Sequence, residues 1–316
     1  MTIVDPFIAW LIATLVHLGS SELCAAGLGF ESQADRVVLT HSGRPIAEFV
    51  FKDPQILRPY IANVRLPSQL QVTRHHPPVA GMDAADHADM HPGVWLGFGD
   101  INGHDFWRNQ GRIGHLRFLQ PPQVVDGRLS FATEDRLVSK GGEPLGRMEN
   151  RITAVERGDG WRLTWEATFV ADNRDLVFGD QEEMGFGARV ATEVTEKKGG
   201  TVRNSDGLQT AKSTWGKPAS WCDYSGTIDG AHCGVTLMTG PSNFRGSWWH
   251  NRDYGLVVAN PFGRAAMKQG ERSQVTVKQG ESLKLTFGAV FHQGAEFDPA
   301  KEYEQFVSSL EPRPAD

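Results

Sequence analysis

Apolar and polar residues alternate strictly in the segment WRLTWEATFV, residues 161–170, and this pattern constrains the fold more than any other feature of the chain. Successive side chains of a β-strand point to opposite faces, so Trp161, Leu163 and Trp165 share one face and the residues between them share the other. The segment therefore predicts an antiparallel strand with one packed face and one wet face.

Similar alternation recurs elsewhere, with Gly, Asp and Asn between the segments, as expected of half-buried strands joined by turns. In RVVLTHSGRPIAEFVFKD, two such runs flank Ser42-Gly43, which predicts a hairpin. No linker, charge run or repeat divides the chain. We therefore predict an all-β fold, a large antiparallel β-sandwich, as a single domain over residues 27–316. The other alternating segments are residues 127–139, 146–172, 185–196 and 273–292.

One helix is predicted, at the C-terminal end, in DPAKEYEQFVSSL. Asp298 provides an N-cap and Pro299 occupies the first helical position. An apolar stripe with helical spacing follows from Tyr303 to Leu310. We expect this helix to dock on a sheet.

The N-terminal segment differs from the rest. Residues 7–18 form a 12-residue apolar run, too short for a membrane span, which needs about 20 residues. Cys24 and Ala26 are small residues at the −3 and −1 positions of a cleavage site, so residues 1–26 resemble a signal peptide and predict a secreted or periplasmic protein. No Lys or Arg precedes Arg36, which leaves a misassigned start or a core helix as alternatives.

The composition and the absence of several motifs exclude some classes of function. The chain has 316 residues and a net charge of −6 with no basic block, so we expect neither a nucleic-acid partner nor attachment to an anionic membrane. No stable membrane span is expected, because the apolar run is too short. It lacks a nucleophile elbow, a Walker A loop and a dinucleotide fingerprint, so no nucleotide cofactor is expected. Cys222 and Cys233 flank a turn-rich stretch and predict either a disulfide across a hairpin or two buried thiols.

The first candidate site is a long irregular stretch, residues 74–114, rich in histidine and carboxylate. Such side chains serve as metal ligands or as general acids and bases. His87 and His91 are four residues apart, but Pro92 and Gly93 follow at once, so a divalent metal is possible but not favoured. Structural roles in turns are the plain alternative. The relevant residues are His75, His76, Asp86, His87, His91, Asp100, Asn102, His104 and Asp105.

Two further segments combine polar and aromatic groups. In WWHNRDYGLVVANPFG, residues 248–263, tryptophans stand beside His250, Arg252 and Asn260, a composition typical of sugar sites, although a pair of core tryptophans would give the same pattern. In GDQEEMGFGARV, residues 179–190, Glu182 and Glu183 precede a strand, where a neighbouring carboxylate would raise the pKa of a general base. Two solvated glutamates on a turn are the alternative.

The chain also resembles a known family. The segments RPYIANVRLPSQLQVTRHHPP, DHADMHPGVWLGFGDINGHDFW and NFRGSWWHNRDYGLVVANPFG are similar, in order, to the bacterial PmoA-like family, which carries the label methane oxygenase, and the resemblance runs from Arg36 to the C-terminus. It implies a metal-dependent oxygenase. Met90 stands where the family pattern has a histidine, and no 20-residue apolar stretch follows the leader. The β-rich pattern is in addition similar to the mutarotase-type supersandwich, whose members bind sugars in a loop-lined cleft.

Together these patterns predict a protein that acts on a carbohydrate or sugar derivative, either a small molecule or an oligosaccharide, by acid–base chemistry of the epimerase, lyase or hydrolase type. A non-catalytic carbohydrate-binding module and a metal-dependent oxygenase are the alternatives, and the cofactor is unknown. The predicted catalytic residues are His87, His91, His104, Glu183 and His250. The predicted substrate-binding residues are His76, Asp100, Asn102, Trp107, Trp249, Arg252 and Asn260.

Overall fold

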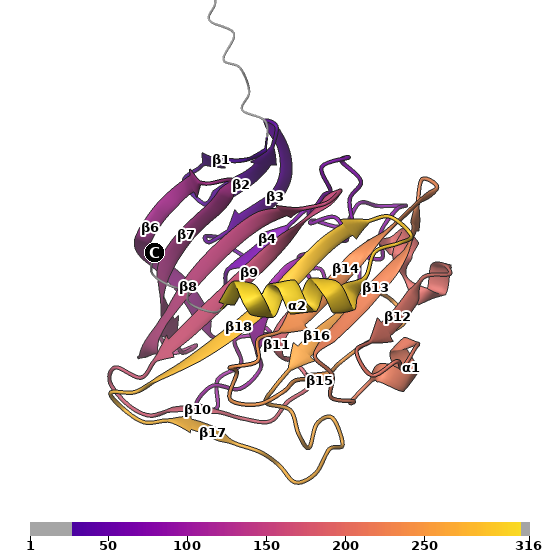
Figure 1. The fold of residues 1–316 in the computed structure, drawn as a ribbon. Coiled ribbons are helices and arrows are strands. Elements are labelled where there is room, and N and C mark those ends of the chain that lie inside the picture. The colour runs from indigo at the N-terminus through magenta and orange to yellow at the C-terminus, as the bar shows by residue number, and fades with distance from the viewer. Residues whose placement is uncertain (1–26, 311–316) are drawn as a thin grey trace, which may run out of the picture.

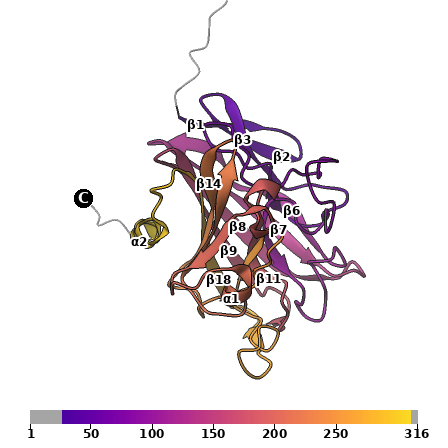
Figure 2. The same ribbon diagram turned by 90° about the vertical axis from the view of Figure 1, so that its right-hand side faces the viewer.

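A computed structural model describes residues 27–310 and consists of two eight-stranded antiparallel sheets packed face to face (Figures 1 and 2). Aromatic side chains from both sheets meet between them: the ring of Phe49 on the first sheet lies 5.0 Å from Phe131 and 5.8 Å from Trp165 on the second. The predicted all-β sandwich is therefore confirmed. The predicted signal peptide lies outside the described residues.

The first sheet has the strand order β1-β2-β3-β4-β5-β11-β16-β15, so strands far apart in the sequence meet at its centre. Its strands are β1 (Leu28–Ser32), β2 (Arg36–His41), β3 (Arg44–Val50), β4 (Tyr60–Ala62), β5 (Val94–Phe98), β11 (Met184–Arg189), β16 (Leu256–Asn260) and β15 (Trp248–Trp249).

The second sheet has the order β12-β13-β14-β18-β9-β8-β7-β6, and β10 and β17 form a small separate ladder. Its strands are β12 (Thr201–Asn204), β13 (Trp221–Ile228), β14 (Ala231–Thr239), β18 (Ser282–Gln293), β9 (Gly160–Val170), β8 (Pro144–Arg157), β7 (Arg128–Val138) and β6 (Arg112–Val125). The remaining elements are β10 (Leu176–Phe178), β17 (Val275–Val277), the 3₁₀ turns at Thr192–Val194 and Glu196–Lys198, and the helices α1 (Ala211–Thr214) and α2 (Pro299–Leu310).

The alternation in β9 works as predicted: Trp161, Leu163 and Trp165 are fully buried in the core. On the opposite face, Arg162 is buried as well, because α2 covers it with the ring of Phe306, 5.9 Å from the guanidinium carbon. The long helix in front of the second sheet in Figure 1 is this α2.

Helix α2 begins at Pro299, and the carboxylate of Asp298 accepts a hydrogen bond from the amide of Ala300 at 2.9 Å, so the predicted cap and helix are confirmed. Phe306 is its fully buried residue. The hairpin between β2 and β3 is also confirmed: Ser42 and Gly43 have φ values of +48° and +74°, which suits a tight two-residue turn.

The two cysteines of the described chain are free and buried. They do lie on a hairpin, β13–β14, with its turn at Asp229-Gly230, but Cys222 pairs with Leu237 and Cys233 with Gly226. Because they are displaced along the ladder, they cannot face each other, and the thiol alternative is the correct one.

The stretch 74–114 is not wholly irregular, contrary to the sequence interpretation. It contains β5, which pairs with β4 and β11 at the centre of the first sheet. Buried on both faces, β5 shows an apolar run instead of alternation. No helix among residues 27–310 is long and apolar enough to cross a membrane.

Candidate functional site

At the centre of the first sheet, several residues on the strands are glycines and carry no side chain. In the ladder between β5 and β11, Gly187 stands opposite Trp95 and Gly185 opposite Gly97. A Cβ atom at Gly187 would lie 2.8 Å from the indole of Trp95, and one at Gly97 would lie 2.5 Å from that of Trp107. These glycines therefore let two tryptophan rings lie against the sheet and form a floor.

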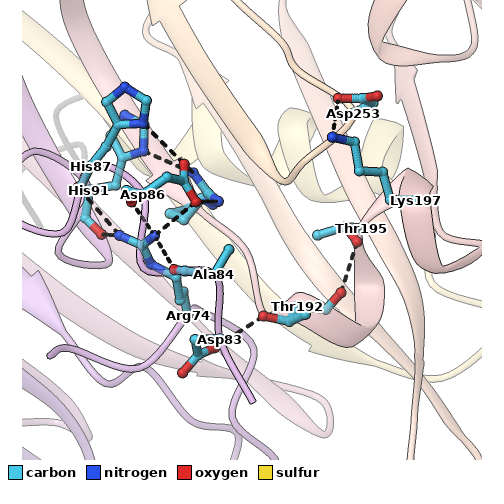
Figure 3. A network of polar contacts seen from close by, with 11 residues as sticks. Arg74, Asp83, Ala84, Asp86, His87, His91, Thr192, Thr195, Lys197 and Asp253 are labelled. Carbon is cyan, nitrogen blue, oxygen red and sulfur yellow. Dashed lines mark hydrogen bonds and ion pairs between the residues drawn. The ribbon is translucent and has the colours of Figure 1, made fainter. Parts of the chain in front are cut away.

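Arg74 fixes the loop that covers this floor. Its side chain is 1% exposed and donates to four main-chain carbonyls, those of Ala84, Asp86, His87 and His91, at 2.6–3.4 Å. Figure 3 shows the arginine beneath the loop with the two histidines above it. One buried cation thus satisfies a stretch of backbone that has no regular secondary structure.

Arg189, at the end of β11, holds the side chains of the same loop. Its guanidinium forms a bidentate pair with Asp86, with N–O distances of 2.9 and 3.0 Å, and lies 4.4 Å above the ring of Tyr254. Burial alone would raise the pKa of Asp86, but the hydrogen bonds from Arg189 and His87 and the arginine charge outweigh it and hold that pKa well below its ordinary value. Asp86 is therefore ionised at neutral pH.

His91 is a neutral imidazole whose proton is on Nε2. Its Nδ1 lies 3.0 Å from a guanidinium nitrogen of Arg189, and because arginine can only donate, Nδ1 must accept. Burial and the charge of Arg189 lower the pKa of His91 to about 2. The ring is stacked on Trp95, with centroids 5.2 Å apart and planes 4° from parallel.

His87 is the exposed member of the group, with 47% of its side chain accessible. Its Nδ1 lies 3.0 Å from the carboxylate of Asp86, and its ring is stacked on that of His91 at 5.0 Å. Since the ionised Asp86 can only accept, Nδ1 carries a proton and Nε2 is the ring nitrogen free to exchange one. Arg189, Asp86 and His87 thus form a hydrogen-bonded series that ends in an exposed imidazole.

His250, from the segment after β15, lines the same pocket and is also neutral. Its Nδ1 accepts from the indole N–H of Trp215 at 3.3 Å, so the proton is again on Nε2. Burial and the charge of Arg252 lower its pKa to about 3. For neither His250 nor His91 does a hydrogen-bond partner of Nε2 occur among residues 27–310.

Two adjacent glutamates have different environments. Glu183 lies 3.2 Å from Arg108. Glu182 lies 3.3 Å from Arg252 and 3.7 Å from His250, and burial raises its pKa despite the nearby arginine. Both carboxylates are half-buried.

These groups converge on one pocket of about 110 Å³ between the loop and the sheet. The segments 86–107 and 248–263 meet in it, and it includes five residues predicted from the sequence. The lining residues are His87, Met90, His91, Trp95, Gly97, Trp107, Arg108, Glu183, Met184, Gly185, His250, Tyr254, Leu256 and Val258.

Other predicted residues lie outside the pocket with structural contacts. Trp249 is fully buried and donates its indole N–H to the carbonyl of Ala219 at 3.0 Å, so its ring is not available for stacking on a ligand. Asn260 is also fully buried; it donates to the carbonyls of Gln181 and Glu182 and positions the segment that carries the glutamates. Arg252 lines an adjoining cavity instead.

Three residues of the His/Asp stretch form a turn next to β10. Asn102 binds the backbone of Asp175 and Val177, and Asp100 accepts from the amide of Gly103. His104 pairs with Ile101 through the backbone. A fourth residue, His76, packs 5.3 Å from the ring of Tyr60, away from the pocket.

Sequence reasoning gave no role to the two arginines that organise the site. Arg74 and Arg189 are 17 and 103 positions from the side chain or carbonyl that they hold. The available signal for Arg189 was a charged residue that follows alternating glycines in a strand, which marks a close approach of another segment.

Asp86, His87 and His91 have ligand atoms within 4.8 Å of one another, a spacing compatible with a metal ion. However, both oxygens of Asp86 and Nδ1 of His91 already accept from Arg189. A cation there would have to displace a buried guanidinium, so this donor set does not fit a metal.

Comparison with known proteins corrects the family assignment. Residues 36–306 match the model of a family described as "Family of unknown function (DUF6807)". The resemblance to the PmoA-like family is therefore wrong, and the oxygenase alternative loses the label on which it depended. No curated protein matches the sequence.

Solved structures similar to this chain include a galactose mutarotase related enzyme from Lactobacillus acidophilus, with 10% identity, coverage of 84% of this chain and 97% of that one, and a TM-score of 0.37. A galactose mutarotase-like protein from Clostridium acetobutylicum has 9% identity, coverage of 85% and 98%, and a TM-score of 0.40. Similarity at this level carries no information about the ligand of this chain.

Proposed function

The chain belongs to the DUF6807 family, whose function is unknown, and we propose that its pocket binds a carbohydrate and performs acid–base chemistry on it. The observation that carries this proposal is the series of hydrogen bonds from Arg189 through Asp86 to His87. It places an oriented, half-exposed imidazole at a pocket that also contains His91 and His250. The pocket thus combines one half-exposed imidazole with two buried ones whose pKa values are lowered.

His87 is the proposed proton carrier. Its Nε2 would take a proton from a sugar hydroxyl or from a carbon next to a carbonyl, and return it later. Asp86, kept ionised by Arg189, fixes the Nδ1–H tautomer and stabilises the imidazolium that forms.

His91 and His250 have a different proposed role. With Nδ1 occupied and a depressed pKa, each presents an Nε2–H at neutral pH and acts as a donor, not as a base. Two such donors would stabilise negative charge that develops on a substrate oxygen. Glu183, held by Arg108, is the second acid–base group of the pocket.

The proposed ligand class follows from the mixture of surfaces. Tyr254 and the accessible part of Trp107 provide aromatic surface, while the histidines and Glu183 provide hydrogen-bonding groups. A pyranose has an apolar face and a rim of hydroxyls, which such a mixture matches.

The test is a saccharide panel measured by ligand-observed NMR for binding, with anomer exchange and formation of unsaturated products as readouts of turnover. We expect His87→Ala to reduce turnover by about 10²–10⁴-fold and to retain binding, and His104→Ala, which is outside the pocket, to behave as the unsubstituted protein. Binding without turnover would identify the non-catalytic carbohydrate-binding module. Absence of binding to every saccharide would contradict the proposal.

We further propose that the protein is exported and cleaved after Ala26, on the basis of the signal-like residues 1–26. Mass spectrometry of the mature protein should then give an N-terminus at Gly27, and an intact Met1 would contradict this.

A further inference from the structure

The pocket that contains His87, His91 and His250 is called the main pocket below. A second cavity of about 460 Å³ adjoins it. Trp215 connects the two: it lines the second cavity, and its indole N–H donates to His250 of the first. Arg252 lines the second cavity and also pairs with Glu182, next to His250. The two cavities therefore lie on the two sides of the Trp215–His250 contact, so units of one extended ligand could occupy both.

The sizes of the two cavities support such an extension. The main pocket, at about 110 Å³, is smaller than typical small-molecule sites, which have about 300–1,000 Å³. The second cavity alone falls within that range. The main pocket thus has room for the reacting part of a ligand, and the second cavity for a neighbouring unit.

Three positively charged side chains line the second cavity, and two of them lie over the ring of Trp215. The guanidinium carbon of Arg252 lies 5.7 Å and the ammonium of Lys268 lies 5.6 Å from the centre of the Trp215 ring, distances at which cation–π attraction acts. Lys212 is a third lining cation. Lys268 has a φ of +57°, an uncommon backbone conformation for a residue with a side chain.

The carboxylates of the same cavity have other partners. Both oxygens of Glu196 lie 3.0 Å from the amide of Ala211, and Asp253 pairs with Lys197 at 3.6 Å. Among residues 27–310, no carboxylate lies within ion-pair distance of Lys212 or Lys268. The two lysines are thus free to meet a negative charge from outside.

A buried amide lies behind the cations. Asn251 is 1% exposed, lines the cavity, and donates its amide to Thr214. Its Oδ1 has no hydrogen-bond partner within the described part of the chain. Because this oxygen is itself buried, the cations and the Trp215 ring are the groups that the cavity offers to a ligand.

We propose that the second cavity is a subsite for a sugar unit with an anionic substituent, a carboxylate or a sulfate, attached to the unit in the main pocket. This inference rests on the proposed function of that pocket and names its substrate class, an acidic oligosaccharide. The cations bind the anionic group, and the ring of Trp215 fixes two of them in place.

The test is calorimetric titration of the whole chain with three disaccharides: digalacturonate, a sulfated disaccharide and lactose. At low salt we expect an anionic disaccharide to bind at least about tenfold more tightly than lactose, and added salt to reduce the difference. The double variant Lys212→Gln with Lys268→Gln should lose about tenfold or more of the anionic affinity, the size of a charge-assisted hydrogen bond, and keep its affinity for lactose. Arginine at both positions should preserve selectivity, and Lys301→Gln on α2 is the matched control.

Each result has a distinct meaning. A preference for digalacturonate or for the sulfated sugar identifies the anion. Equal binding of all three disaccharides, unaffected by the double variant, would overturn the subsite and leave the proposed function of the main pocket intact. Failure of all three to bind would overturn the subsite, and the saccharide panel decides the function of the main pocket separately.

Discussion

Two of the Asp–His pairs among residues 27–310 lie on the outer faces of opposite sheets, and they differ in whether the imidazole is accessible. On the second sheet, Asp223 is fully buried and accepts from His292, Thr236, Ser225 and Arg203 at 2.7–3.2 Å. On the first sheet, Asp86 holds a His87 that is half exposed.

The side chains around the Asp223–His292 pair leave no space for a ligand. The ring of His292 is 2% exposed and stacked at 3.6 Å against Phe297, which precedes α2. Burial alone would raise the pKa of Asp223, but the charge and hydrogen bond of His292, with the bond from Thr236, lower it to about 2. The comparison shows that an Asp–His pair marks a candidate site only where the imidazole has a free nitrogen in a pocket.

The largest predicted effect is seen when the histidine of each pair is replaced by glutamine and the two variants are compared. His87→Gln should reduce turnover of a saccharide substrate by about 10²–10⁴-fold, the usual contribution of a general acid or base, with a melting temperature near that of the unsubstituted protein. His292→Gln should lower the melting temperature and leave turnover per folded molecule unchanged. Steady-state kinetics and thermal unfolding measure the two, and a loss of turnover in both variants would remove the distinction.

The second prediction concerns the closed pair alone. Asp223→Ala removes one partner of a buried charged network, a change that costs about 3–5 kcal/mol, and should lower the free energy of unfolding in urea by that amount. Saccharide affinity of the folded fraction should stay unchanged. A loss below 1 kcal/mol would mean that Asp223 is not the centre of the network.

The third prediction concerns the glycines against which the rings of Trp95 and Trp107 lie. Gly187→Ala places a Cβ atom 2.8 Å from the indole of Trp95, so the ring must move; such overpacking costs about 1–3 kcal/mol and should weaken saccharide binding as well. Gly246→Ala is the matched control, since a Cβ atom there has no neighbour within 4 Å among the described residues. Equal behaviour of the two variants would show that the floor does not depend on glycine.

The smallest effect is in the pH dependence of stability. His91 and His250 have folded-state pKa values lowered to about 2 and about 3, below the value of about 6.5 for an unfolded histidine. Between these limits the unfolded chain binds more protons, so stability falls as pH drops below about 6.5 and the loss per histidine approaches about 1.4 kcal/mol per pH unit. Urea unfolding from pH 7 to pH 5 should show a shallower slope for His250→Gln; an unchanged slope would contradict the neutral assignment.

Most of the fold was predictable because it depends on local patterns. The alternation of β9, the turn at Ser42-Gly43 and the cap at Asp298 each lie within a few residues of the structure that they specify. Strand β5 was missed because Gly97 interrupts it and because burial on both faces removes the alternation.

The site was predictable only in outline. Composition identified the two segments that meet, but it could not distinguish Trp107, which lines the pocket, from Trp249, which lies in the core. The roles of Arg74 and Arg189 depend on contacts between distant segments, and His91 becomes a donor only because Arg189 occupies its Nδ1. No local pattern encodes such a pairing.

The most direct test of the central claim, that the open Asp–His pair serves a carbohydrate site, is a crystal structure with the tightest saccharide of the panel bound. We predict a sugar ring in the pocket beside Tyr254 and Trp107, with one hydroxyl or ring oxygen within hydrogen-bond distance of Nε2 of His87 and another oxygen accepting from His91 or His250. A saccharide bound elsewhere on the chain, with this pocket filled only by water, would contradict the claim.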